Sequence, residues 1–86
     1  MKLYVIVRSN LSKSQQAVQA GHAVAQFLLE NRETEWSNGT LVYLKSRSLR
    51  PYLRRKHTAF FEPDIGNEMT AIATLDSKDL GSLPLM

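Results

Sequence analysis

The sequence predicts a small α/β domain built on a mixed four-stranded sheet flanked by helices, in the order β-α-β-α-β-β. Short runs rich in β-branched and aromatic residues alternate with segments of helical periodicity, which is typical of this class. A long helix after the first strand favours a right-handed parallel crossover, whereas a short turn before the last strand favours a hairpin. The chain has 86 residues, so we expect a single domain spanning residues 1–86.

The first predicted strand is Lys2–Arg8, and it is followed by a long helix at Lys13–Asn31. The strand is apolar between two charged ends, as expected of a central strand that is covered on both faces. Ser12 is a candidate N-cap for the helix, with Gln15 three residues later as its capping-box partner.

The helix is amphipathic, and its broad apolar face is expected to pack on the sheet. That face comprises Ala17, Val18, Ala20, Gly21, Val24, Ala25, Phe27, Leu28 and Leu29. The opposite, narrow polar stripe comprises Gln15, Gln19, His22 and Gln26.

Three further strands are predicted at Thr40–Lys45, Thr58–Glu62 and Met69–Leu75. Between the first two of these, Ser48 can cap a short helix with Pro51 in its first turn, where a missing N–H is tolerated. Residues 76–86 contain Gly81 and Pro84 and leave room for at most one helical turn. The C-terminal part is therefore expected to be short and irregular.

Composition excludes several kinds of chemistry. The chain has no cysteine, so disulfides, thiolate nucleophiles and cysteine metal sites are excluded. Its two histidines, His22 and His57, belong to no spaced ligand set, so we expect neither a metal site nor a cofactor. The apolar run near the N-terminus is too short for a signal peptide or a membrane span, so we expect a cytoplasmic protein without membrane association.

The charges are distributed unevenly. Residues 1–57 carry ten Lys and Arg against three acids, whereas residues 58–86 carry one base against five acids. The basic part is concentrated in Lys45, Arg47, Arg50, Arg54, Arg55 and Lys56. Such clustering favours a polyanionic partner, although a basic run can also be a solvated helix face.

Two groups of polar residues are candidates for chemistry. Lys13, Gln15, Gln19 and His22 lie at the start of the long helix, where free N–H groups favour a phosphate or a developing oxyanion. The simpler alternatives are a solvent-exposed polar stripe and a structural His22.

The second group is the turn around Asp64, followed by Thr70, which could meet the first group beyond the strand ends. Alternatively, Asp64 and Asn67 only build the turn. With no glycine-rich phosphate loop, no Gly-x-Ser-x-Gly elbow and no cysteine, any hydrolysis would use water oriented by lysine, histidine or aspartate.

These residues resemble a known pattern. The segments Tyr4–Arg8, Ser12–Gln15 and Ala17–Ala23 are similar to the first strand, the lysine loop and the Ala-Ala-Gln-x-x-His-Ala helix of type 2 peptidyl-tRNA hydrolases. Asp64-Ile65-Gly66 and Thr70–Thr74 resemble the Asp-Ala-Gly turn and the following strand of that family. The chain departs from the family at Gln15, where a second lysine is usual, and in its shortened C-terminus.

The resemblance implies metal-independent hydrolysis of the ester that joins a peptide to the terminal ribose of tRNA. It implies catalytic roles for Lys13, Asp64 and Thr70, with His22 in support, and a tRNA or peptidyl-tRNA partner. Substrate-binding roles are expected for Gln15, Gln19, Arg47, Arg50, Arg54 and Arg55. The alternative is a non-catalytic tRNA-binding or RNA-binding, or assembly, module that keeps the fold.

A homodimer is also expected. The residues after 75 are too few and too broken to cover what a full helix would cover. An apolar patch should then remain on one face, with Trp36, Phe60 and Phe61 as candidates to line it, and a two-fold dimer would bury that patch.

Overall fold

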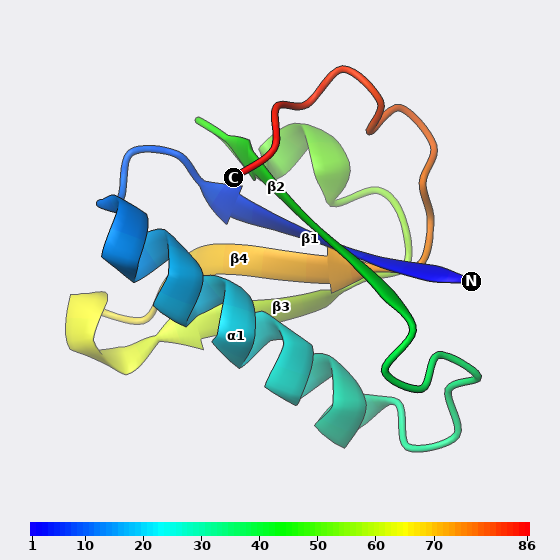
Figure 1. The fold of residues 1–86 in the computed structure, drawn as a ribbon. Helices are drawn as coiled ribbons and strands as arrows, with labels where there is room; N and C mark the ends of the chain where they lie inside the picture. Colours follow the sequence, from blue (N-terminus) through cyan, green and yellow to red (C-terminus); the bar gives the residue numbers. More distant parts are fainter.

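The computed structural model describes all 86 residues and confirms the α/β fold (Figure 1). The main elements are β1 (Lys2–Arg8), α1 (Lys13–Glu30), β2 (Thr40–Ser46), β3 (Thr58–Glu62) and β4 (Glu68–Thr74). Two single 3₁₀ turns, η1 (Arg50–Tyr52) and η2 (Pro63–Ile65), precede and follow β3. The second predicted helix is therefore only a three-residue turn, and α1 is the one long helix.

The sheet is mixed and has the strand order β2-β1-β4-β3. β1 and β2 are parallel, in register from Lys2 beside Thr40 to Arg8 beside Ser46. β4 runs antiparallel to β1 and forms a hairpin with β3. The parallel crossover and the hairpin, both predicted from the connection lengths, are confirmed.

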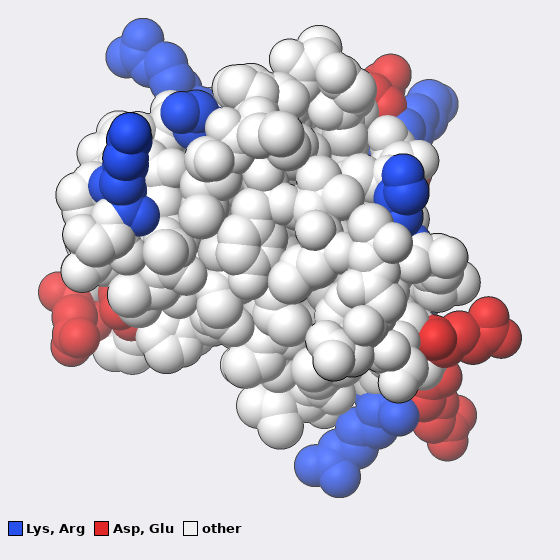
Figure 2. All heavy atoms as spheres, in the orientation of Figure 1, with Lys and Arg blue, Asp and Glu red and all other residues white.

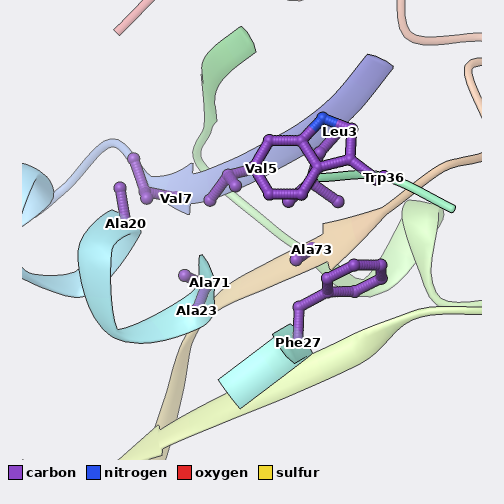
Figure 3. Packing of buried hydrophobic residues seen from close by; sticks show 9 residues of the cluster. All are labelled: Leu3, Val5, Val7, Ala20, Ala23, Phe27, Trp36, Ala71 and Ala73. Carbon is purple, nitrogen blue, oxygen red and sulfur yellow. The ribbon is translucent and has the colours of Figure 1, made fainter. Parts of the chain in front are cut away.

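α1 packs on one face of the sheet (Figure 1). The core between them contains small residues from the helix and β4, and larger ones from β1, together with Phe27 and Trp36 (Figure 3). The other face is covered by a second core cluster, in which Leu49 and Leu80 pack with Ile6, Leu44 and Ile72. Both faces of β1 are therefore buried, as its apolar sequence predicts.

Only part of the predicted apolar face, including Ala20 and Phe27, packs on the sheet, because α1 is rotated so that Gln16 and Gln19 are buried as well. Its buried residues are Gln16, Gln19, Ala20, Ala23 and Phe27, whereas Val18, Leu28 and Leu29 are 48%, 43% and 61% exposed. Alanines allow the helix to approach the sheet closely, and the two glutamine amides find hydrogen-bond partners there, so their burial is not penalised. The rest of the predicted apolar face, including Val18, Leu28 and Leu29, consequently points outward.

The C-terminal residues cover more of the sheet than predicted. Leu80 is buried in the second core cluster, and Leu83 packs against it. The backbone then pairs with the outer edge of β2 through Lys45 N to Pro84 O (3.1 Å) and Met86 N to Tyr43 O (3.0 Å).

Trp36 does not line an exposed patch, contrary to expectation. It is 4% exposed, because its indole fills the core under the loop after α1 and its Nε1 donates to Thr40 O at 2.9 Å.

No helix of the fold is sufficiently long and apolar to pass through a lipid bilayer.

Candidate functional site

The polar residues singled out in the sequence gather at one edge of the sheet. β1 and β2 end at this edge, β3 ends there and β4 begins there, because β4 runs antiparallel to its neighbours. Arg8, at the end of β1, donates to Glu68 Oε2 at 3.2 Å and to Asn10 Oδ1 at 3.2 Å. The start of α1 and the η2 turn lie at the same end of the molecule (Figure 1).

Gln19 connects three elements at this edge. Its side chain is fully buried, and its Oε1 accepts a hydrogen bond from the Thr70 hydroxyl at 2.6 Å. Its Nε2 donates to Glu62 Oε1 at 3.1 Å and to Gln15 Oε1 at 3.3 Å. Because the Glu62 carboxylate can only accept, it faces the nitrogen end of the amide, and the oxygen end then accepts from the Thr70 hydroxyl.

Gln16 fixes the loop between β1 and α1. Its buried side chain donates to Leu11 O at 2.8 Å and to Ser9 O at 3.4 Å. The Ser12 hydroxyl accepts from Gln15 N at 3.2 Å, which confirms the predicted N-cap. Together these bonds determine where α1 begins and therefore where Lys13 lies.

Lys13 and Asp64 are both exposed at this end of the sheet, as is Glu68. Lys13 is the first residue of α1, and Asp64 lies within η2. No ion pair joins them; the single ion pair of the chain is that between Arg8 and Glu68. The turn after Asp64 depends on Gly66, which adopts φ 60°, and on a bond from Asn67 N to Glu62 O at 2.9 Å.

His22 and Thr70 have different surroundings from the exposed charges. The imidazole of His22 stacks on the ring of Phe60, with centroids 4.6 Å apart and planes inclined by 10°. His22 is nevertheless exposed at its outer side, one turn of α1 beyond Gln19. Thr70 is fully buried, so it can act on a substrate only through Gln19.

The basic cluster lies on the other side of the sheet from α1, around η1. Leu49, Tyr52 and Leu53 face the second core cluster, and Arg50 and Arg54 face outward, as their spacing predicts. Arg47 is exposed as well. Figure 2 shows Lys and Arg around the rim of the molecule and not at the centre of the face over α1.

Arg55 is engaged within the protein. Its Nη1 donates to Asp76 O at 2.8 Å and to Lys78 O at 2.7 Å, and its Nε donates to Tyr52 O at 3.1 Å. The guanidinium thus ties the chain after β4 to η1. A hollow of about 730 Å³ lies beside it, lined by Arg50, Pro51, Arg54, Arg55, Asp76, Lys78 and Asp79.

A second hollow, of about 620 Å³, lies at the opposite end of the sheet from Lys13. It is lined by residues from the end of α1, the start of β3 and the end of β4, among them Phe27, Asn31, Thr58 and Thr74.

Nowhere in the chain do three His, Asp or Glu side chains come together as possible metal ligands.

Sequence reasoning did not single out Gln16 or Glu62. The signal for Gln16 was its position four residues after the N-cap Ser12, where a long amide can reach back to loop carbonyls. Glu62 offered a weaker signal, as a charged residue at the end of a strand, beside the predicted site.

Comparison with known protein families and with curated protein sequences finds no match to this chain.

Proposed function

We propose that this protein hydrolyses the ester bond of peptidyl-tRNA, or a related aminoacyl ester, in the cytoplasm and without a metal. The observation that supports this most is the buried hydrogen-bond relay from Thr70 through Gln19 to Glu62. It ends at the sheet edge where Lys13 and Asp64 are exposed.

Burying the side-chain amide of Gln19 costs desolvation free energy that its hydrogen bonds must offset. Burying a polar group is unfavourable unless it is hydrogen-bonded, and an apolar side chain of similar size would avoid the requirement altogether. Here every buried polar side-chain atom has a partner. A fully satisfied network of this kind gives its members one fixed orientation, which is what a site for oriented water needs.

The proposed reaction assigns a role to each group. Water, deprotonated by Asp64, attacks the carbonyl carbon of the ester, and the Lys13 ammonium stabilises the developing oxyanion. The bond between the carbonyl carbon and the ribose oxygen then breaks, and the proton passes to that oxygen. General acid–base assistance of this kind is worth roughly 10²–10⁴ in rate. Gln19 and Thr70 are positioning residues, because Thr70 has no exposed surface.

The exposed cations would bind the tRNA backbone. Of the 11 Lys and Arg in the chain, only Arg8 has a carboxylate within ion-pair distance. Arg47, Arg50 and Arg54 are exposed and are therefore free to contact phosphates, which supply most sequence-independent affinity for nucleic acids. Arg55 is better described as structural, because its Nε and Nη1 donate to three backbone carbonyls.

The second candidate is a tRNA-binding module without catalysis. It is favoured by the absence of an ion pair or hydrogen bond between Lys13 and Asp64, which leaves these two groups unconnected in the free protein. Catalytic geometry often tightens only when substrate binds, so this observation does not decide between the candidates.

The deciding experiment measures release of peptide from purified peptidyl-tRNA together with tRNA binding. Lys13→Ala and Asp64→Asn are the test variants, and Lys2→Ala, at the opposite end of the sheet, is a matched exposed control. We expect at least a hundredfold loss of turnover in both test variants, with tRNA affinity largely retained and the control unaffected. Tight binding of tRNA by the wild type without any turnover would instead establish the binding module.

A further inference from the structure

The outer face of α1 is apolar, exposed and without a partner in the chain. Val18, Leu28 and Leu29 are its large members, each more than two-fifths exposed. Ala17, Gly21 and Ala25 form a ridge of small residues between them, and all three are exposed. No Lys, Arg, Asp or Glu occurs in α1 between Lys13 and Glu30. Figure 2 shows uncharged atoms over most of the length of this helix, with charged side chains only around the rim.

Nothing within the chain requires a glycine at position 21 for lack of space. A Cβ added at this position would meet nothing within 4 Å, and the residue has ordinary helical geometry. Glycine is less favourable in a helix interior than every residue except proline. Its usefulness in the middle of a helix is that it lets another backbone approach closely. The open position therefore suits a second helix lying across α1.

We propose that the occupant of this face is a second copy of the chain, with the two α1 helices packed antiparallel about a two-fold axis near Gly21. The face is self-complementary in that arrangement only. Its first half is mostly small, at Ser14, Ala17 and Gly21, with Val18 as the one larger member, whereas its last half is large, at Leu28 and Leu29. Antiparallel pairing places the leucines of one helix over the small residues of the other. Parallel pairing would oppose leucine to leucine and leave a gap at the small end.

The charges and the size of the face agree with this occupant. An isologous interface brings identical patches together, so a patch without charges avoids like-charge contacts. A strongly charged partner, such as a nucleic acid, would find no charge there to recognise. An 18-residue helix is about 27 Å long. Protein interfaces range from roughly micromolar to picomolar affinity, and we expect a dimer held by this one helix face to lie at the micromolar end.

Sedimentation equilibrium across micromolar concentrations is the first test. We expect the wild type to form a dimer that Leu29→Glu weakens at least tenfold. Phe61→Glu is the matched control, because Phe61 is 52% exposed but pairs with Met69 on β4, which packs in the core cluster away from α1. A wild type that stays monomeric overturns the proposal. So does dissociation by Phe61→Glu with none by Leu29→Glu.

The Gly21→Ala variant distinguishes an effect on the dimer interface from an effect on folding. Because the new methyl group meets nothing within the chain, the variant should melt at a higher temperature under dilute, monomeric conditions. The same methyl group would push the two helices apart, so the dimer dissociation constant should rise at least tenfold. A Gly21→Ala variant that dimerises as well as the wild type contradicts close packing at this residue.

Disulfide cross-links can show how the two α1 helices are oriented in the dimer. The chain contains no cysteine, so any disulfide must form between introduced cysteines. Gly21→Cys should form a disulfide-linked dimer on mild oxidation, whereas Gly81→Cys, exposed elsewhere, should not. A mixture of Ser14→Cys and Leu28→Cys should cross-link, and Ser14→Cys alone should not. Efficient cross-linking of Ser14→Cys with itself would indicate parallel helices and overturn the proposed arrangement.

Discussion

The hydroxyl of Thr70 donates to the side-chain oxygen of Gln19 at 2.6 Å, across the boundary between β4 and α1. Both side chains are fully buried, so this bond lies in the core and not on the surface of the site. The same Gln19 amide also donates to Glu62 at the end of β3. The position of the Glu62 carboxylate therefore depends on how α1 packs against the sheet.

Thr70→Val should destabilise the protein while preserving the shape of the core. Valine fills the same volume but leaves the Gln19 oxygen buried without a donor, at a cost of about 1–3 kcal/mol. Urea denaturation measures this loss, with Thr40→Val, at an exposed position, as control.

The double variant Thr70→Val with Gln19→Leu should recover part of that stability, because the buried Gln19 oxygen is removed and Glu62, which loses its bond to Gln19, is only half-buried and can be hydrated. On the proposed function it should still lack ester hydrolysis. Recovery of activity together with stability would show that the relay serves folding alone.

Arg50→Gln combined with Arg54→Gln should weaken tRNA binding with little effect on folding, because both side chains are exposed. Each lost phosphate contact should reduce the slope of log K against log salt by roughly 0.7–0.9. Filter binding or anisotropy at several salt concentrations measures the slope. An unchanged slope would show that tRNA binds elsewhere.

Arg55→Ala should behave differently from its basic neighbours. It removes three hydrogen bonds to backbone carbonyls, two of them to the segment after β4. We expect a loss of about 1–3 kcal/mol in unfolding free energy and faster amide exchange in residues 76–80, with a smaller change in salt slope than for Arg50→Gln. A stable Arg55→Ala variant with impaired tRNA binding would reverse these roles.

His22→Asn should retain the fold and lower hydrolysis less than Lys13→Ala does. The imidazole stacks on Phe60, so the loss should be one of packing and local order. His22→Phe, which keeps an aromatic stack without the ring nitrogens, should be closer to the wild type than His22→Asn. If both histidine variants abolish turnover and Lys13→Ala spares it, the ring nitrogens take part in the reaction.

The fold was accessible from sequence because its signals are local. The apolar run in β1, the cap at Ser12 and the breakers around Gly66 each determine a short stretch of backbone, and connection length then determines strand direction. The orientation of α1 was not accessible in this way. Most of its circumference is apolar or small, so polarity alone did not distinguish the buried face from the exposed one.

The candidate site was only partly accessible for the same reason. Gln19 was identified as part of a polar stripe, but its burial depends on Thr70 and Glu62, which are 51 and 43 residues away in the chain. Arg55 was grouped with its basic neighbours because charge is visible in the sequence. Its partners are backbone carbonyls, which the side-chain sequence does not reveal.

The pairing of residues 84–86 with β2 also protects the protein against aggregation. Unpaired strand edges are templates on which other chains can add strands. One edge of this sheet is occupied by the chain's own C-terminal residues, and the other ends in β3, which has five residues, a register shift between Phe60 and Phe61, and Pro63 directly after it. Neither edge offers a long, regular template, so the addition of strands from other chains should be slow unless residues 84–86 are displaced.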